Sequence, residues 1–212
     1  EESPFLLIST GTWSISLNPF SDEMLTKDDL ENDCLNYMRT DGKVVRASRL
    51  LLGHEYNLQV EKLVAFFNKE KGYDKTAKFD EEIFEKLLKA QVVYFHFENT
   101  HRMRLQPDKT NFENFENFEE AYHQLMYELV ELQVQSANRA IGNTDIRKIY
   151  IDGGFADNEV YIKILTHSFP QYIIYSTQSP LGSALGAAMI ISGKKTSNNF
   201  LKEYYEMQKH DI

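Results

Sequence analysis

Hydrophobic and polar positions alternate along the first part of the chain. Residues 5–8 form a short apolar run that predicts a buried strand, and residues 13–17 alternate apolar and polar side chains with the period of two typical of a second strand. A second hairpin is predicted for residues 35–39 and 44–47, which flank Asp41-Gly42, a pair typical of two-residue turns. We therefore expect the first third of the chain to be mostly antiparallel β-structure.

The spacing of apolar residues becomes helical in the middle of the chain. Two amphipathic helices are predicted, one from about Gly53 and one after Asp80. Residues 92–95 are interpreted as either a strand or a buried turn. Residues 100–114 are polar and irregular, which favours a surface loop.

A long helix is predicted for residues 118–141, with Gly142-Asn143 as its stop signal. Its stripe of small and apolar residues, which we expect to face the core, consists of Leu125, Leu129, Leu132, Ser136 and Ala140.

The last third of the chain changes character again. A strand at 148–151 leads into the turn Gly153-Gly154 and a helix at 158–168, and a strand at 172–175 leads into a helix at 181–192. Strand, helix, strand, helix predicts a crossover unit with parallel strands. An antiparallel meander followed by such a unit is the order of the ribonuclease H-like domain, so the expected fold is α/β, a mixed sheet flanked by helices.

Composition and charge narrow the class of protein. The 42% apolar and 13% aromatic content indicates an ordinary globular domain rather than a disordered chain. Lys and Arg number 23 against 32 Asp and Glu, and the net charge of -9 argues against nucleic acid as a partner. No apolar stretch reaches the roughly 20 residues of a membrane span. The single cysteine, Cys34, and the lack of a secretory pattern before Phe5 favour a cytoplasmic location.

Two glycine-containing loops are suited to cradling phosphate. In Ser9-Thr10-Gly11-Thr12, glycine lets backbone N–H groups approach an anion closely. In the segment 152–158, a strand ends in two glycines and a helix begins, so a helix N-terminus faces the same space. Either loop taken alone is more often just a turn.

Together these loops resemble a known set of motifs. Ile8-Ser9-Thr10-Gly11-Thr12-Trp13-Ser14 resembles the second phosphate loop of FGGY carbohydrate kinases, in the Ser-x-Gly-Thr-Trp-Ser form of rhamnulokinases and fuculokinases. Asp152 to Asn158 is similar to the family's adenosine motif, and Ala184 to Ala188 to its small-residue hinge helix. The resemblance spans residues 5–193, essentially the C-terminal domain of the family.

The resemblance implies roles for individual residues. It assigns Thr12, beside Gly11, to the nucleotide phosphates, Gly154 to the ribose and α-phosphate, and Asn158 to the edge of adenine, with Gly153 supplying the turn.

A fainter part of the resemblance lies at the start of the first middle helix. Gly53 and Asn57 have the family spacing that would place both beside the nucleotide, although an ordinary helix start with Asn57 facing solvent explains them equally well. Phe155 departs from the small residue found in many members, and would either wall the adenine or narrow the pocket.

The resemblance also implies what the chain lacks. It implies ATP or ADP as cofactor together with Mg²⁺, whose ligands are expected mainly in an N-terminal domain that also holds the catalytic base and binds the sugar. We expect residues 1–212 to be the nucleotide-binding half of a kinase acting on a ketose or deoxyketose, with no catalytic residue of its own and no activity alone. The start at Glu1, without methionine, agrees with an excised piece. A homodimer is left open, and the alternatives are another actin-like ATPase or a noncatalytic nucleotide-binding or interaction module.

Other patterns point less clearly to chemistry. His96 and His101 lack a third ligand at a recognisable spacing, so no metal site is predicted. Gly193 and the lysines after it are better interpreted as the end of a helix than as a P-loop. Arg46 and Arg49 either face a domain cleft or pair with the abundant carboxylates.

Overall fold

The computed structural model describes residues 3–99, 105–177, 182–192 and 207–211. The strands are β1 Phe5–Thr10, β2 Ser14–Asn18, β3 Cys34–Met38, β4 Val44–Leu50, β5 Lys148–Gly153, β6 Ile173–Thr177 and β7 Met207–His210. The helices are α1 Lys27–Glu31, α2 Leu52–Phe66, α3 Glu81–Ala90, α4 Phe118–Ile141, α5 Glu159–Ser168 and α6 Gly182–Ser192, with short 3₁₀ helices η1 Tyr73–Thr76 and η2 Phe112–Asn114.

All these strands join one mixed sheet in the order β3-β4-β2-β1-β5-β6-β7. The pairs β1–β2, β2–β4 and β3–β4 are antiparallel, whereas β5 runs parallel to both β1 and β6. The antiparallel first third and the parallel crossover of the last third are confirmed. Because β1 and β5 are parallel neighbours, the loops that follow them leave the sheet at the same edge.

The turn of the second hairpin differs from the expected two-residue turn. The strands end at Met38 and begin again at Val44, and the N–H of Arg39 donates to the carbonyl of Lys43 at 2.8 Å. Gly42 alone in this loop has a positive φ, of 81°. A turn closed by the Gly42 N–H on the Arg39 carbonyl therefore precedes one left-handed residue, which makes the loop three residues long.

Helix α4 packs along the sheet and forms the centre of the core. It contacts β1, β2 and β4 on one side and α2 and α5 on others. The predicted stripe is confirmed, since all five of its residues are fully buried. Beneath α4 the sheet is partly polar: Ser14 donates to Gln133 at 2.5 Å, and the hydroxyls of Ser48 and Ser136 are 2.9 Å apart. Small hydroxyl residues let the helix approach the sheet while every buried polar group is paired.

The segment before the polar loop is a buried turn. No strand forms over residues 92–95, although Phe95 is fully buried. The backbone N–H groups of Tyr94 and Phe95 donate instead to the buried carboxylate of Glu128 on α4. A side chain thus replaces the missing strand partner. His101 and the other residues of 100–104 lie outside the described residues.

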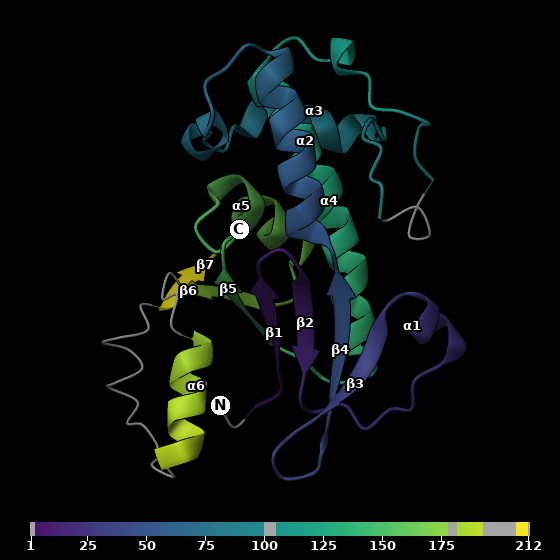
Figure 1. Cartoon of the computed structure of the whole chain (residues 1–212), viewed down its shortest axis with the longest axis vertical. Coiled ribbons are helices and arrows are strands. Elements are labelled where there is room, and N and C mark those ends of the chain that lie inside the picture. The colour runs from purple at the N-terminus through teal and green to yellow at the C-terminus, as the bar shows by residue number, and fades with distance from the viewer. Residues whose placement is uncertain (1–2, 100–104, 178–181, 193–206, 212) are drawn as a thin grey trace.

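The remaining helices lie mainly beyond one edge of the sheet. Figure 1 shows α2 and α3 past the end at which the β1 and β4 arrows terminate, with α5 beside the end of β5. Helix α6 begins at Gly182, and the predicted start at Leu181 lies outside the described residues, as does Gly193. It contains no charged residue, and Ile190 and Ile191 are 66% and 87% exposed.

Candidate functional site

The two glycine loops are joined by Thr10, the last residue of β1. Its hydroxyl donates to the Asp152 carbonyl at 2.5 Å and accepts from the Phe155 N–H at 3.0 Å. Its carbonyl accepts from the Gly154 N–H at 2.9 Å. Gly153 has a φ of 86°, and a Cβ there would lie 1.8 Å from the Thr10 carbonyl oxygen. Only glycine allows the β5 loop to lie this close to β1.

The start of α2 lies against the first glycine loop. A Cβ on Gly53 would lie 2.0 Å from the carbonyl oxygen of Gly11. The His54 N–H, in the first turn of α2, donates to the carbonyl of Thr12 at 3.2 Å. The end of β1, the end of β5 and the first turn of α2 therefore meet at one place.

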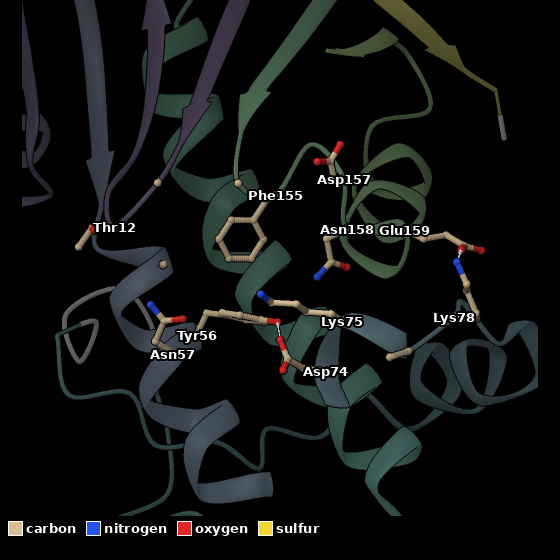
Figure 2. Close-up of a pocket in the computed structure, with 14 residues that line it drawn as sticks. Thr12, Tyr56, Asn57, Asp74, Lys75, Lys78, Phe155, Asp157, Asn158 and Glu159 are labelled. Atoms are coloured by element: carbon tan, nitrogen blue, oxygen red, sulfur yellow. Dashed lines mark hydrogen bonds and ion pairs between the residues drawn. The ribbon is translucent and has the colours of Figure 1, made fainter. Parts of the chain in front are cut away.

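A pocket of about 540 Å³ opens where these elements meet, and Figure 2 shows its side chains. It is lined by Gly11, Thr12, Gly53, Tyr56, Asn57, Asp74, Lys75, Ala77, Lys78, Gly154, Phe155, Asp157, Asn158 and Glu159. Six of the seven residues predicted from the sequence line it. The seventh, Gly153, is spent on the close contact with Thr10. Asn57 is solvent-exposed as well as pocket-lining, so both interpretations of its position hold.

Asn158 is held in the pocket wall by both ends of its amide. Its side-chain oxygen accepts from the Tyr161 N–H at 3.0 Å, which caps the N-terminus of α5. Its side-chain nitrogen donates to the hydroxyl of Tyr122 at 2.7 Å. One amide hydrogen of Asn158 is left for a ligand.

A chain of hydrogen bonds continues from Asn158 across the pocket. The hydroxyls of Tyr122 and Tyr56 are 3.1 Å apart, and Tyr56 donates to the Asp74 carboxylate at 2.7 Å. Because a carboxylate accepts and an amide nitrogen donates, every proton of this chain points from Asn158 towards Asp74. Burial raises the pKa of both tyrosines, and their mutual contact raises that of Tyr56 further, so both stay protonated donors.

Phe155 forms part of the pocket wall. Its ring is 6% exposed and contacts the rings of Tyr56 and Tyr161, each with centroids 5.0 Å apart. These contacts hold the ring on the side of the pocket between the β5 loop and α2 (Figure 2). Of the two interpretations of Phe155, the structure favours a wall.

The charged residues of the pocket are ones that sequence reasoning missed. Asp74 and Lys75 belong to η1, and Lys78, which follows it, pairs with Glu159 at 3.2 Å. Asp157 lies just before the N-cap of α5. The one local signal was Gly72, whose φ of 90° turns the chain into η1. No periodicity indicates that a four-residue turn faces a loop more than 60 residues away.

The two arginines singled out from the sequence pair with carboxylates. Arg46 is buried and contacts Asp29 at 2.7 Å, and Arg49 contacts Asp33 at 2.6 Å. Burial of Asp29 alone would raise its pKa, but hydrogen bonds from Thr26 and the charge of Arg46 outweigh burial, so its pKa is lowered. Within the described residues, no group of three or more His, Cys, Asp or Glu side chains is arranged to hold a metal.

A mixed sheet with flanking helices, whose glycine loops surround one pocket, is the architecture of the C-terminal domain of sugar kinases. The family model described as "Carbohydrate kinase FGGY, C-terminal domain" matches residues 2–199, and the chain belongs to this family.

Solved structures agree with this assignment. A carbohydrate kinase from Novosphingobium aromaticivorans superposes with a TM-score of 0.66 at 17% identity, covering 98% of this chain and 43% of the kinase. A ligand-bound xylulose kinase from Lactobacillus acidophilus has a TM-score of 0.65 at 12% identity, covering 98% and 42%. Plasmodium falciparum glycerol kinase with ADP has a TM-score of 0.58 at 13% identity, covering 93% and 40%.

These identities are low, so the likeness establishes the fold, and this chain spans about two fifths of the length of those kinases. No curated protein matches the chain. Among the described residues, no helix is both long and apolar enough to cross a membrane.

Proposed function

We propose that this chain is the ATP- and ADP-binding half of a carbohydrate kinase that transfers a phosphoryl group to a sugar hydroxyl. The observation that carries the proposal is the meeting of the β1 loop, the β5 loop and the start of α2 around one pocket. Backbone N–H groups of glycine loops are neutral donors suited to phosphate oxygens. The ADP in the related glycerol kinase supports a nucleotide as the ligand.

Each part of the pocket has a proposed role. Thr12 and Gly11 face the phosphates, with Gly53 and Asn57 beside them. Gly154 has no atom within 4 Å of a Cβ position, so its surface is free to meet the ribose and α-phosphate. Asn158 offers its remaining amide hydrogen to the edge of adenine, and Phe155 forms the neighbouring wall.

Phosphoryl transfer needs more than this pocket. It requires a group that takes the proton of the attacking sugar hydroxyl and a cation that neutralises the transferred phosphate. We propose that an N-terminal domain supplies the base, the sugar site and most Mg²⁺ ligands, since the related kinases are more than twice as long as this chain. The pocket carboxylates fit Mg²⁺ poorly, because Asp74 accepts from Tyr56 and Glu159 pairs with Lys78.

Helix α6 is the proposed contact with that domain. Its exposed apolar residues Ile190 and Ile191 lie next to the small residues Ala187 and Ala188, and small side chains let two elements slide at close approach. We propose a ketose or deoxyketose as substrate, from the form of the first glycine loop, and a cytoplasmic location, where ATP is at hand. A homodimer remains a prediction.

Two measurements test the proposal. Calorimetric titration of the 212-residue protein with ADP should give saturable binding, and the isolated protein should release no ADP from ATP when sugars are added. The parent protein should release ADP in a coupled assay only when its own sugar is present, within a panel of ketoses and polyols. If no sugar or polyol stimulated ADP release, the kinase function would be wrong, and hydrolysis without sugar would favour another actin-like ATPase. No nucleotide binding at all would favour a noncatalytic module.

A further inference from the structure

The 3₁₀ turn η1 forms a wall of the pocket that the glycine loops do not supply, and it is anchored on both sides. The hydroxyl of Tyr73 donates to Glu119 at 2.8 Å, and its ring contacts Phe118 with centroids 5.0 Å apart. The next residue, Asp74, accepts from the buried hydroxyl of Tyr56 at 2.7 Å. The backbone that carries the following residue, Lys75, is therefore fixed to α2 and to the first turn of α4.

Lys75 extends from this anchored turn into the pocket. Figure 2 shows its side chain crossing below Phe155 towards Tyr56, on the side of Asn57 and Thr12. The other basic residue of the pocket, Lys78, pairs with Glu159. Lys75 pairs with no carboxylate in the part of the chain that the structure describes.

The charges around the pocket leave one cation to meet an anionic ligand. Asp74, Asp157 and Glu159 line the pocket, and the whole chain carries a net charge of -9. A diphosphate entering this space is repelled by the carboxylates and attracted by an ammonium group that is not already neutralised. The glycine loops offer only neutral N–H donors, so the unpaired charge of Lys75 is the feature best matched to phosphate.

We propose that Lys75 contacts the phosphates of the bound nucleotide, and that η1 is an additional part of the nucleotide site. The inference rests on the proposed function, because it presumes that a nucleotide occupies this pocket. It adds a charged, ligand-contacting residue from a turn that belongs to neither glycine loop. Tyr56 acts as a positioning residue, since its hydroxyl holds the turn through Asp74.

The test compares ligands that differ only in phosphate. Binding of ADP and of adenosine is measured for the wild-type protein, Lys75→Met, Lys75→Arg and the control Lys71→Met, whose lysine is exposed on the same loop but does not line the pocket. Lys75→Met should weaken ADP binding about tenfold and change adenosine binding less than about twofold. Lys75→Arg should restore most of the ADP affinity. ADP binding by the wild type should weaken with added salt more steeply than binding by Lys75→Met.

The outcomes separate the inference from the function beneath it. If wild-type protein fails to bind ADP, the nucleotide function itself is wrong. If the wild type binds ADP and Lys75→Met binds it equally well, Lys75 makes no phosphate contact while the nucleotide function stands. Equal losses for ADP and adenosine would also overturn the inference, because they place the effect of Lys75 on the nucleoside. A loss in Lys71→Met as large as in Lys75→Met would reduce the effect to general electrostatics.

Discussion

Gly53 and Gly11 are in backbone contact, so that a Cβ on Gly53 would lie 2.0 Å from the Gly11 carbonyl oxygen and 2.9 Å from its carbonyl carbon. The atom in the way is main chain, which has no rotamer to change. A helix start and a hairpin loop are thereby pressed together without an intervening side chain. The same contact brings the first turn of α2 to the mouth of the pocket.

The first prediction is that Gly53→Ala destabilises the fold and distorts the pocket together. The added methyl group must push α2 away from the β1 loop, and overpacking of this kind costs about 1–3 kcal/mol. Chemical denaturation should show the loss in the free energy of unfolding, and calorimetry should show weaker ADP binding. Unchanged stability would mean that the contact is looser than described.

Gly154→Ala is the matched opposite case. No atom lies within 4 Å of a Cβ at Gly154, and its φ is not in the left-handed region. We expect the free energy of unfolding to stay within about 0.5 kcal/mol of wild type. The methyl group would occupy space proposed for the ribose and α-phosphate, so ADP binding should weaken by about tenfold or more. Normal ADP affinity would show that Gly154 serves only the turn.

Two substitutions at Asn158 separate its structural role from its proposed ligand contact. Serine still caps a helix, whereas alanine does not, and loss of an N-cap costs about 1 kcal/mol. Asn158→Ser should therefore keep most of the stability that Asn158→Ala loses. Both should bind ADP more weakly than wild type, since neither presents an amide to the base. Full ADP affinity in Asn158→Ser would remove Asn158 from the nucleotide site.

His123 predicts a dependence of stability on pH. Its Nε2 accepts from the Asp80 N–H at 2.9 Å and its Nδ1 donates to the Glu119 carbonyl at 2.7 Å, an arrangement that requires the neutral ring. Burial lowers the pKa of His123, although the Glu119 carbonyl and the charges of Asp80 and Glu119 oppose the shift. The unfolded chain therefore takes up a proton near its ordinary pKa of about 6.5 that the folded protein still refuses.

The contribution of His123 is thus complete above about pH 6.5 and is lost as the pH falls below it, by at most about 1.4 kcal/mol per pH unit. Unfolding by urea at pH 7.5 and pH 5.5 measures this loss. His123→Gln, which keeps a donor and an acceptor, should lose less stability over the same interval. The pKa of His210 is also lowered, chiefly by burial, and the comparison with the variant cancels its contribution. Equal losses in the two proteins would contradict the assignment.

Much of the fold follows from local patterns in the sequence. Strands, the long helix and its buried stripe were predictable because period-two and helical spacing reflect one-sided burial. The alternation in β2 was misleading in one respect: Ser14 and Ser16 are fully buried under α4, whereas Ile15 and Leu17 lie on the other face and are only half-buried. The partner of the strand decides which face is covered, and a strand's own sequence does not contain that information.

The site was predictable where glycine is required by backbone contact and not where side chains converge. Gly11, Gly53 and Gly154 could be found from motif spacing. Tyr56, Asp74 and Lys75 could not, because their meeting depends on how η1 is anchored to α4 by Tyr73. Such a wall becomes visible only when the helices are in place.

The contact between Thr10 and Gly153 has a mechanical consequence. Three hydrogen bonds and a main-chain approach that no Cβ would allow tie the ends of β1 and β5 into a single rigid body. The two glycine loops therefore cannot open or close independently of each other. Any adjustment of the pocket to its ligand must come from α2 and η1, which move against this fixed base as a jaw moves against an anvil.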